Sequence, residues 1–323
     1  MRNKAILLLF VFIGLISCKN KSDVKVLNLA HSLPQSHPVH KGILTFQKAL
    51  AKKSGGKLII KIFPDGQLGS EREVVELLQI GSVAITKVSA ATMANFVPDY
   101  NVLGVPYLFR DKAHLFKVLE GDVGKYLLQK GSHYWLRGLC FYDAGSRSFY
   151  TKDKAIRTPA DLKGLKIRVM NSQAAINMVN ALGGSATPMA YSELYTAIQQ
   201  GVVDGAENNP PSFVSSNHFE VSKYYTLDEH SSVPDVLIIG TKYWEKFSEQ
   251  EKEWIQEAVA ESVIAQKEFW RESVAESMKK VKAAGVEVIR PDKSLFAEQS
   301  KSVLEEIIKD PVLNRLVKQI QAQ

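Results

Sequence analysis

The sequence lacks the local signatures of most enzyme classes and is poor in cysteine. Its 323 residues contain no GxSxG, HExxH, CxxC or phosphate-loop glycine motif, which argues weakly against catalysis because many active sites have no local motif. Only two cysteines are present, Cys18 and Cys140. Cys140 lies between Leu139 and Phe141 without a neighbouring base, which favours a buried apolar side chain over a nucleophile.

Long apolar runs are also missing, apart from one at the N-terminus. Residues 1–17, MRNKAILLLFVFIGLIS, place Arg2 and Lys4 before a run that is short for a membrane span, which predicts a secretory signal peptide. The run ends in LIS before Cys18 and the polar KNKSD, so we expect Cys18 to be lipidated and residues 18–23 to be a linker. The alternative is that Cys18 is an ordinary residue of a soluble precursor.

Charge is not concentrated enough to indicate a nucleic-acid partner. The chain has 41 Lys and Arg against 34 Asp and Glu, and loss of Arg2 and Lys4 with the signal leaves 39 basic residues, a net charge of about +5. The lysines are scattered and not clustered with aromatic residues. Removing 17 residues from 323 leaves 306, which is enough for two lobes that fold without an intramolecular disulfide.

Three histidines, His31, His37 and His40, are close together in the sequence. No cysteine or carboxylate lies near His37 and His40 to complete a metal shell, so we expect neither a metal nor another cofactor. Helix capping and hydrogen bonding to a ligand are the favoured roles.

Strand-like and helix-like segments alternate, which predicts an α/β fold. The expected strands include residues 24–31, 57–63, 83–90 and 165–171, and the expected helices include 37–56, 71–81 and 172–184. Residues 248–285 contain no proline and no internal glycine. A continuous helix here would extend roughly 55 Å, enough to cross two lobes. Two helices with a break near Gln266 fit the pattern equally well.

Two arginines are the most informative charged residues. Arg168 lies within the apolar strand LKIRVMN, at whose end a helix is expected to begin, and ligands collect at such strand ends. Arg147 lies beside a glycine turn in DAGSRSFY. Two guanidinium groups at the edge of a cleft suit a carboxylate. From these residues alone, pairing of Arg168 with a protein acid such as Glu207 or Asp204 is equally acceptable.

Several motifs together resemble the DctP-type substrate-binding proteins of tripartite ATP-independent periplasmic (TRAP) transporters. They are LGSEREVVELLQIGSVAI, VPYLFRD, TPADLKGLKIRVMNS, SELYTAIQQGVVDGAENNPPS and FEVSKYY, and they occur in order over nearly all of the chain after the signal. The resemblance implies two α/β lobes with a ligand cleft between them, which close by bending at the connecting strands and at a long helix that spans both lobes. Residues 248–285 are the expected spanning helix.

The resemblance also implies the residues of the binding site and the extent of each lobe. Arg168 is expected to hold the ligand carboxylate, supported by Arg147, Asn208, Asn171, Glu71, His31, Ser89 and Tyr191. We expect lobe I to comprise residues 24–144 plus 233–270, and lobe II to comprise 145–232 plus 271–323. No catalytic residue is expected.

The implied function is an extracytoplasmic receptor that is anchored to the membrane through Cys18, captures an organic acid and delivers it to the small and large TRAP membrane subunits. HSLPQSHPVH, AGSRSFY and ENNPPSF look most like relatives that bind hexuronates such as glucuronate and galacturonate. Glu71 would oppose a C4-dicarboxylate if it faces the pocket, whereas Glu71, His31, Asn208 and His37 could bind sugar hydroxyls. Sialic acid and a C4-dicarboxylate remain alternatives, and a lipid-anchored enzyme acting on acidic sugars is the alternative from another class.

Overall fold

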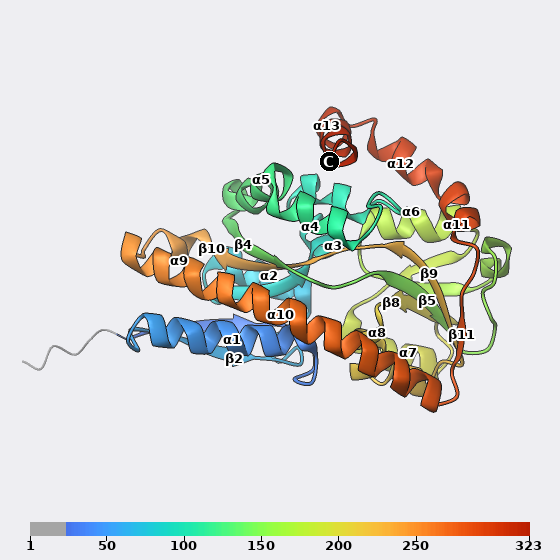
Figure 1. Ribbon diagram of the computed structural model, residues 1–323, viewed down its shortest axis with the longest axis horizontal. Coiled ribbons are helices and arrows are strands. Elements are labelled where there is room, and N and C mark those ends of the chain that lie inside the picture. The colour runs from blue at the N-terminus through green and yellow to red at the C-terminus, as the bar shows by residue number, and fades with distance from the viewer. Residues whose placement is uncertain (1–23) are drawn as a thin grey trace, which may run out of the picture.

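The computed structural model describes residues 24–323 (Figure 1). The expected signal peptide, Cys18 and the linker lie outside the described residues. Within the described range, no helix is long and apolar enough to cross a membrane.

The first sheet has the strand order β2-β1-β3-β10-β4. Its strands are β1 (Lys25–Ala30), β2 (Leu58–Phe63), β3 (Ile85–Ser89), β4 (Leu136–Tyr142) and β10 (Asp235–Gly240). Strands β1, β2 and β3 are parallel because helices α1 (Pro38–Lys53) and α2 (Glu71–Ile80) make the crossovers between them. Strand β10 is antiparallel to both β3 and β4, and it returns to this sheet from the second one.

The second sheet has the order β11-β9-β5-β8-β6-β7. Its strands are β5 (Arg147–Thr151), β6 (Lys166–Val169), β7 (Ser185–Pro188), β8 (Gly205–Asn208), β9 (Tyr224–Ser231) and β11 (Glu287–Ile289). Its α-helices between β6 and β9 are α6 (Gln173–Ala181), α7 (Leu194–Gln199) and α8 (Pro210–Ser215). The two sheets and their helices confirm the predicted two-lobe α/β fold.

The remaining helices cover the two sheets and the ends of the molecule. They are α3 (Ala90–Met93), α4 (Lys112–Glu120), α5 (Asp122–Lys130), α9 (Thr241–Trp244), α11 (Lys293–Gln299), α12 (Lys301–Ile307) and α13 (Pro311–Gln321). Short 3-10 helices are η1 (Pro98–Gly104), η2 (Gly131–Tyr134), η3 (Pro159–Leu162), η4 (Tyr191–Glu193) and η5 (His218–Glu220).

One uninterrupted helix, α10 (Glu249–Ala283), crosses from the first sheet to the second (Figure 1). Its 35 residues span about 52 Å, and its start is fixed by a capping box between Ser248 and Glu251. The prediction of a continuous helix is confirmed, and the alternative break near Gln266 is wrong. Gln266 instead fastens the helix to the first crossing between the sheets: its Nε2 donates to Asp143 O at 2.8 Å and its Oε1 accepts from Asp143 N at 2.9 Å.

The hydrophobic core is divided between the two sheets. Cys140 is buried in the first-sheet core, where burial raises the pKa of its thiol. The C-terminal helix α13 also packs in the first-sheet core through Leu316, Val317 and Ile320, whereas the sequence prediction places residues 271–323 in lobe II. Its amphipathic pattern shows that one face is buried but does not say against which lobe. The other lobe boundaries remain our proposal.

Candidate ligand-binding site

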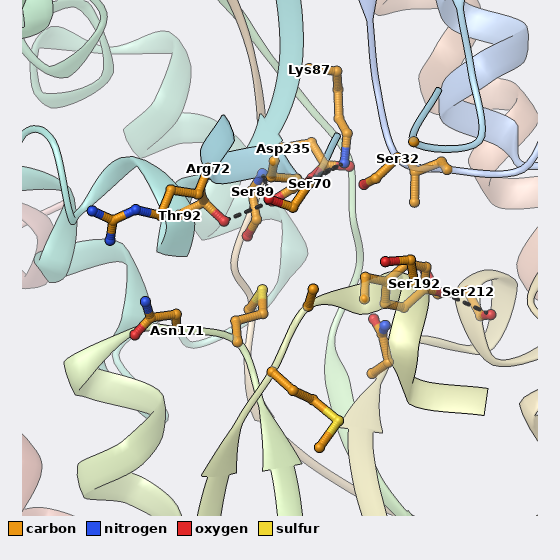
Figure 2. A pocket seen from close by; sticks show the side chains of 18 of the residues that line it. Ser32, Ser70, Arg72, Lys87, Ser89, Thr92, Asn171, Ser192, Ser212 and Asp235 are labelled. Atoms are coloured by element: carbon orange, nitrogen blue, oxygen red, sulfur yellow. Dashed lines mark hydrogen bonds and ion pairs between the residues drawn. The ribbon is translucent and has the colours of Figure 1, made fainter. Parts of the chain in front are cut away.

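A cavity of about 580 Å³ lies between the two sheets. Strands β1 and β3 of the first sheet and β6 and β8 of the second end at it, which is where open α/β sheets bind ligands. Figure 2 shows Lys87, Ser89 and Asp235 on one side of the open space and Ser192 and Ser212 across from them. The cavity therefore has a first-sheet wall and a second-sheet wall.

Arg168 lies on β6, in the second-sheet wall, and is 2% exposed. Its Nε and Nη2 donate to Met189 O at 3.1 and 2.9 Å, and its Nη1 is buried without a hydrogen-bond partner. The guanidinium carbon is 5.6 Å from the centre of the Tyr191 ring. Burial lowers the pKa of Arg168, because the charge is desolvated without a counter-ion.

The protein acids that could have neutralised Arg168 are engaged elsewhere. Glu207 pairs with Arg147, and Asp204 accepts from the backbone nitrogen of Lys166 at 2.7 Å. Across residues 24–323, Arg168 forms no ion pair with a carboxylate. The alternative that Arg168 pairs with a protein acid such as Glu207 or Asp204 is therefore wrong.

Arg147, at the start of β5, is by contrast fully paired. Its Nη2 donates to Glu207 Oε1 and to Glu207 O, both at 2.8 Å, and its Nη1 donates to Asn208 Oδ1 at 3.0 Å. Glu207 also contacts His230, which donates to Asp228 at 2.8 Å. Burial alone would lower the pKa of His230, but the carboxylates of Asp228 and Glu207 raise it to about 9. Arg147 is thus held by a buried network with no net charge.

The first-sheet wall carries three charged side chains in contact. Lys87 Nζ lies 3.0 Å from Glu71 Oε1 and 3.0 Å from Asp235 Oδ1. The other oxygen of Glu71 accepts from Ser89 N at 3.1 Å and from the Thr92 hydroxyl at 2.7 Å. Burial would lower the pKa of Lys87, but the two carboxylates raise it, so the amine stays protonated.

Two residues of this wall, Lys87 and Asp235, are not among the site residues expected from the sequence. Lys87 lies in the apolar segment VAITKVSA, just as Arg168 lies in LKIRVMN. Both residues are cations within an apolar strand, so the feature that singles out Arg168 in the sequence also applies to Lys87. The sequence around Asp235 does not indicate a binding site as clearly. This residue begins an apolar strand, and acidic residues are common in the turns that precede strands.

His31 does not line the cavity, although we expected it to contact the ligand. Its Nδ1 accepts from Leu33 N at 3.2 Å, so its Nε2 carries the proton and donates to His40 Nδ1 at 2.9 Å. Burial, together with the charge of Lys87, lowers the pKa of His31 to about 3. The ring is therefore neutral and saturated by the protein.

His37 lines the cavity and joins the two walls. Its Nδ1 caps α1 by accepting from Val39 N at 3.2 Å, which is the capping role expected from the sequence. The protonated Nε2 donates to Ser212 Oγ, on α8, at 3.1 Å.

The remaining expected residues, Asn208, Asn171, Ser89 and Tyr191, all line the cavity. Asn171 also takes part in a bond between the lobes, because its carbonyl accepts from Asn95 Nδ2 at 2.6 Å. The Tyr191 hydroxyl bonds to Ser216 Oγ at 2.7 Å, which fixes the ring beside Arg168. Apart from His31, the structure brings every expected ligand-binding residue to one cavity.

The histidines and carboxylates are not arranged as a metal centre. Within residues 24–323, no group of three or more His, Cys, Asp or Glu side chains could hold a metal ion. The cavity offers instead one unneutralised cation and many hydrogen-bonding groups, which is the chemistry of a site for a small polar anion.

Two sheets, a spanning helix and a polar cavity between the lobes define a ligand-binding protein that encloses its ligand. The model of the family "DctP: Bacterial extracellular solute-binding protein, family 7" matches residues 29–310. This chain belongs to that family. It is also 34% identical over 290 residues to a solute-binding protein of Chromohalobacter salexigens, with 89% of this chain and 86% of the relative covered.

Two solved structures of TRAP periplasmic solute-binding proteins are similar throughout. One, from Bradyrhizobium sp., contains α/β-D-galacturonate; it is 40% identical with a TM-score of 0.90, and the match covers 93% of this chain and 100% of that one. The other, from Roseobacter denitrificans, contains β-D-glucuronate; it is 36% identical with the same TM-score and coverage. These similarities confirm the resemblance on which the predicted receptor class was based.

Proposed function

We propose that this protein is a receptor for a hexuronate, such as galacturonate or glucuronate, and is not an enzyme. The observation that carries the proposal is the charge of the cavity. Arg168 is buried without a counter-ion on one wall, while Glu71 and Asp235 are carboxylates on the other. A ligand with one carboxylate and several hydroxyls complements both walls.

In this proposal the sugar carboxylate binds Arg168, next to the network that holds Arg147. Asn208, Asn171, Glu71, Ser89 and Tyr191 contact the rest of the ligand. The amide nitrogen of Asn208 bonds to no acceptor in the part of the chain that the structure describes, so its donors are available. His31 is not among the proposed contacts, because its ring nitrogens are already bonded to Leu33 N and His40.

The proposal includes export and partners. Residues 1–17 act as a signal peptide and Cys18 is lipidated, which tethers the receptor to the outer face of a membrane. Closure of the lobes around the uronate then presents the loaded receptor to the small and large subunits of a TRAP transporter. Mass spectrometry of protein isolated from membranes tests the tether: a diacylated Cys18 supports it, and an unmodified residue at that position contradicts it.

A calorimetric panel tests the ligand. Galacturonate, glucuronate, sialic acid and succinate are titrated into the purified protein, and we expect micromolar or tighter binding of at least one uronate. Binding of only succinate or sialic acid contradicts the proposal. Mass spectrometry of the uronate after prolonged incubation tests the enzyme alternative, for which a chemically changed product is the required result.

A further inference from the structure

The first-sheet wall contains a charged subsite that the carboxylate clamp does not explain. Glu71, at the start of α2, Lys87, on β3, and Asp235, at the start of β10, form the contacts described above and all line the cavity. Lys87 is 2% exposed and Asp235 is 7% exposed. One cation between two anions leaves this trio with a net charge of −1.

The trio, whose members all line the cavity, still has unused hydrogen-bonding capacity. Asp235 uses Oδ1 to accept from Lys87, and no donor from residues 24–323 bonds to its Oδ2. Lys87 donates to two carboxylates, and an ammonium group has three donors. One acceptor and one donor on neighbouring side chains match the hydroxyl groups of a polyol, because each hydroxyl can both donate and accept.

The same trio opposes a second negative charge. Lys87 cannot turn towards a ligand anion without leaving two desolvated carboxylates unpaired. Burial and the charge of Glu71 raise the pKa of Asp235, and Lys87 lowers it, with a net rise. The positive charge of Lys87 therefore does not fully compensate the Asp235 carboxylate. Arg72 is the remaining cation on this side, but it is 58% exposed and pairs with Glu76 at 3.1 Å.

We propose that Glu71, Lys87 and Asp235 form a charge-selective hydroxyl subsite that accepts the uncharged end of a sugar acid and excludes a second carboxylate. The inference rests on the proposed uronate function and adds a selectivity for sugar acids with one carboxylate over those with two. Hexuronates bind, and the aldaric acids that differ from them by one further carboxylate are rejected. Selectivity against the dianion thus comes from a like charge built into the wall.

Asp235→Asn tests the proposal, since it keeps the size of the side chain and changes the charge of the wall from −1 to 0. Titration calorimetry compares D-galacturonate with D-galactarate, and D-glucuronate with D-glucarate, in the wild type and the variant. We expect the wild type to prefer a uronate to its aldarate by at least about 100-fold, and the variant to reduce this ratio at least about tenfold. Asp153→Asn, which breaks an exposed ion pair with Lys223, is the matched control and should leave the ratio unchanged.

Two results overturn the subsite: equal binding of the uronate and its aldarate by the wild type, or an unchanged ratio in Asp235→Asn. If that variant does not fold, Glu71→Gln makes the same charge change and the same readings apply. If no uronate binds, the proposed ligand is wrong, and 4-hydroxybutyrate and succinate, which differ by a terminal hydroxyl and a carboxylate, test the subsite separately. Preference for 4-hydroxybutyrate supports it, and preference for succinate or no binding at all overturns it.

Discussion

The two walls of the cavity differ in whether their buried cation is paired with a carboxylate. On the second-sheet wall, Arg168 is buried, and within residues 24–323 its only hydrogen-bond acceptor is the carbonyl of Met189. On the first-sheet wall, Lys87 is equally buried but lies between two carboxylates. A cation without a counter-ion is costly in the empty protein and is available to a ligand, whereas a paired cation stabilises the protein and is not.

The second sheet contains the same contrast between a paired and an unpaired arginine. Arg147 belongs to a network of Glu207, His230 and Asp228 that satisfies every charge internally. Arg168, on the same sheet, is excluded from it. Within residues 24–323, one arginine of this sheet is therefore paired with a carboxylate and the other is not.

The largest expected effect comes from breaking the paired arginine. Glu207→Gln leaves the buried Arg147 and His230 without their shared anion, and we expect the free energy of unfolding to fall by about 3–5 kcal/mol. Urea unfolding followed by circular dichroism measures this. Glu287→Gln, which removes an exposed ion pair with Arg157, should have little effect. A Glu207→Gln protein as stable as the wild type would contradict the assignment of a structural role to this network.

The second-largest effect is expected for Arg168, and it should lower ligand affinity without lowering the free energy of unfolding. Arg168→Met removes the carboxylate partner, so we expect galacturonate affinity to fall by about 2–5 kcal/mol, at least about 30-fold. The ligand-free protein should be as stable as the wild type or more stable, because the variant also removes a buried, unpartnered donor. Calorimetry and urea unfolding give the two readings. Unchanged affinity, or a large loss of stability, would contradict the proposed role.

Two buried histidines, His31 and His230, should give opposite pH dependences. The pKa of His31 is lowered to about 3, so its contribution to stability is present above the usual value of 6.5 and is lost as the pH falls towards 3. The pKa of His230 is raised to about 9, so its contribution is present below 6.5 and is lost as the pH rises through 9. We expect a stability maximum near neutral pH.

Variants measure how much His31 and His230 each contribute to one side of this maximum. His31→Asn should remove about 1–2 kcal/mol of the loss between pH 6.5 and 5, and His230→Asn should flatten the alkaline side. Unfolding free energies at a series of pH values test both. If His31→Asn keeps the wild-type pH dependence of stability on the acidic side, or His230→Asn keeps it on the alkaline side, that histidine does not contribute as predicted.

The smallest expected effect lies at a contact between the lobes. Asn95 donates to the carbonyl of Asn171 at 2.6 Å, in an exposed position. Asn95→Ala should weaken ligand binding by about 0.5–1.5 kcal/mol, mainly through faster dissociation. Stopped-flow kinetics measures the rate. Asn101→Ala, which removes a bond to Pro98 within one lobe, should change nothing, and an equal effect of both variants would exclude a specific role in closure.

The parts of the site that sequence reasoning could predict depend on local pattern. A guanidinium in the apolar strand KIRV at a strand end indicates a ligand site, because such a position is buried and faces a cleft. The parts that it missed depend on contacts between distant segments. Residues 71, 87 and 235 meet only because β3 and β10 are adjacent in the sheet, and the sequence does not specify that adjacency.

His31 and α13 show the same limit. The end of β1 lies at the cavity, but both ring nitrogens of His31 are bonded to Leu33 N and His40, and the residue does not line the cavity. The apolar stripe of α13 predicts a buried face, yet both lobes offer apolar surface. The hydrophobic pattern shows that a helix has a buried face, but only the tertiary packing shows which lobe that face contacts.

By itself, the sequence determined the α/β alternation, the helical character of residues 249–283 and the placement of an arginine where a charge is expensive. These follow from local backbone preferences and hydrophobic periodicity, which act over a few residues. Only the tertiary structure decided which acids neutralise which bases. Ion pairing depends on distances between segments far apart in the chain. Within residues 24–323, those distances pair Arg147 and Lys87 with carboxylates and leave Arg168 without one.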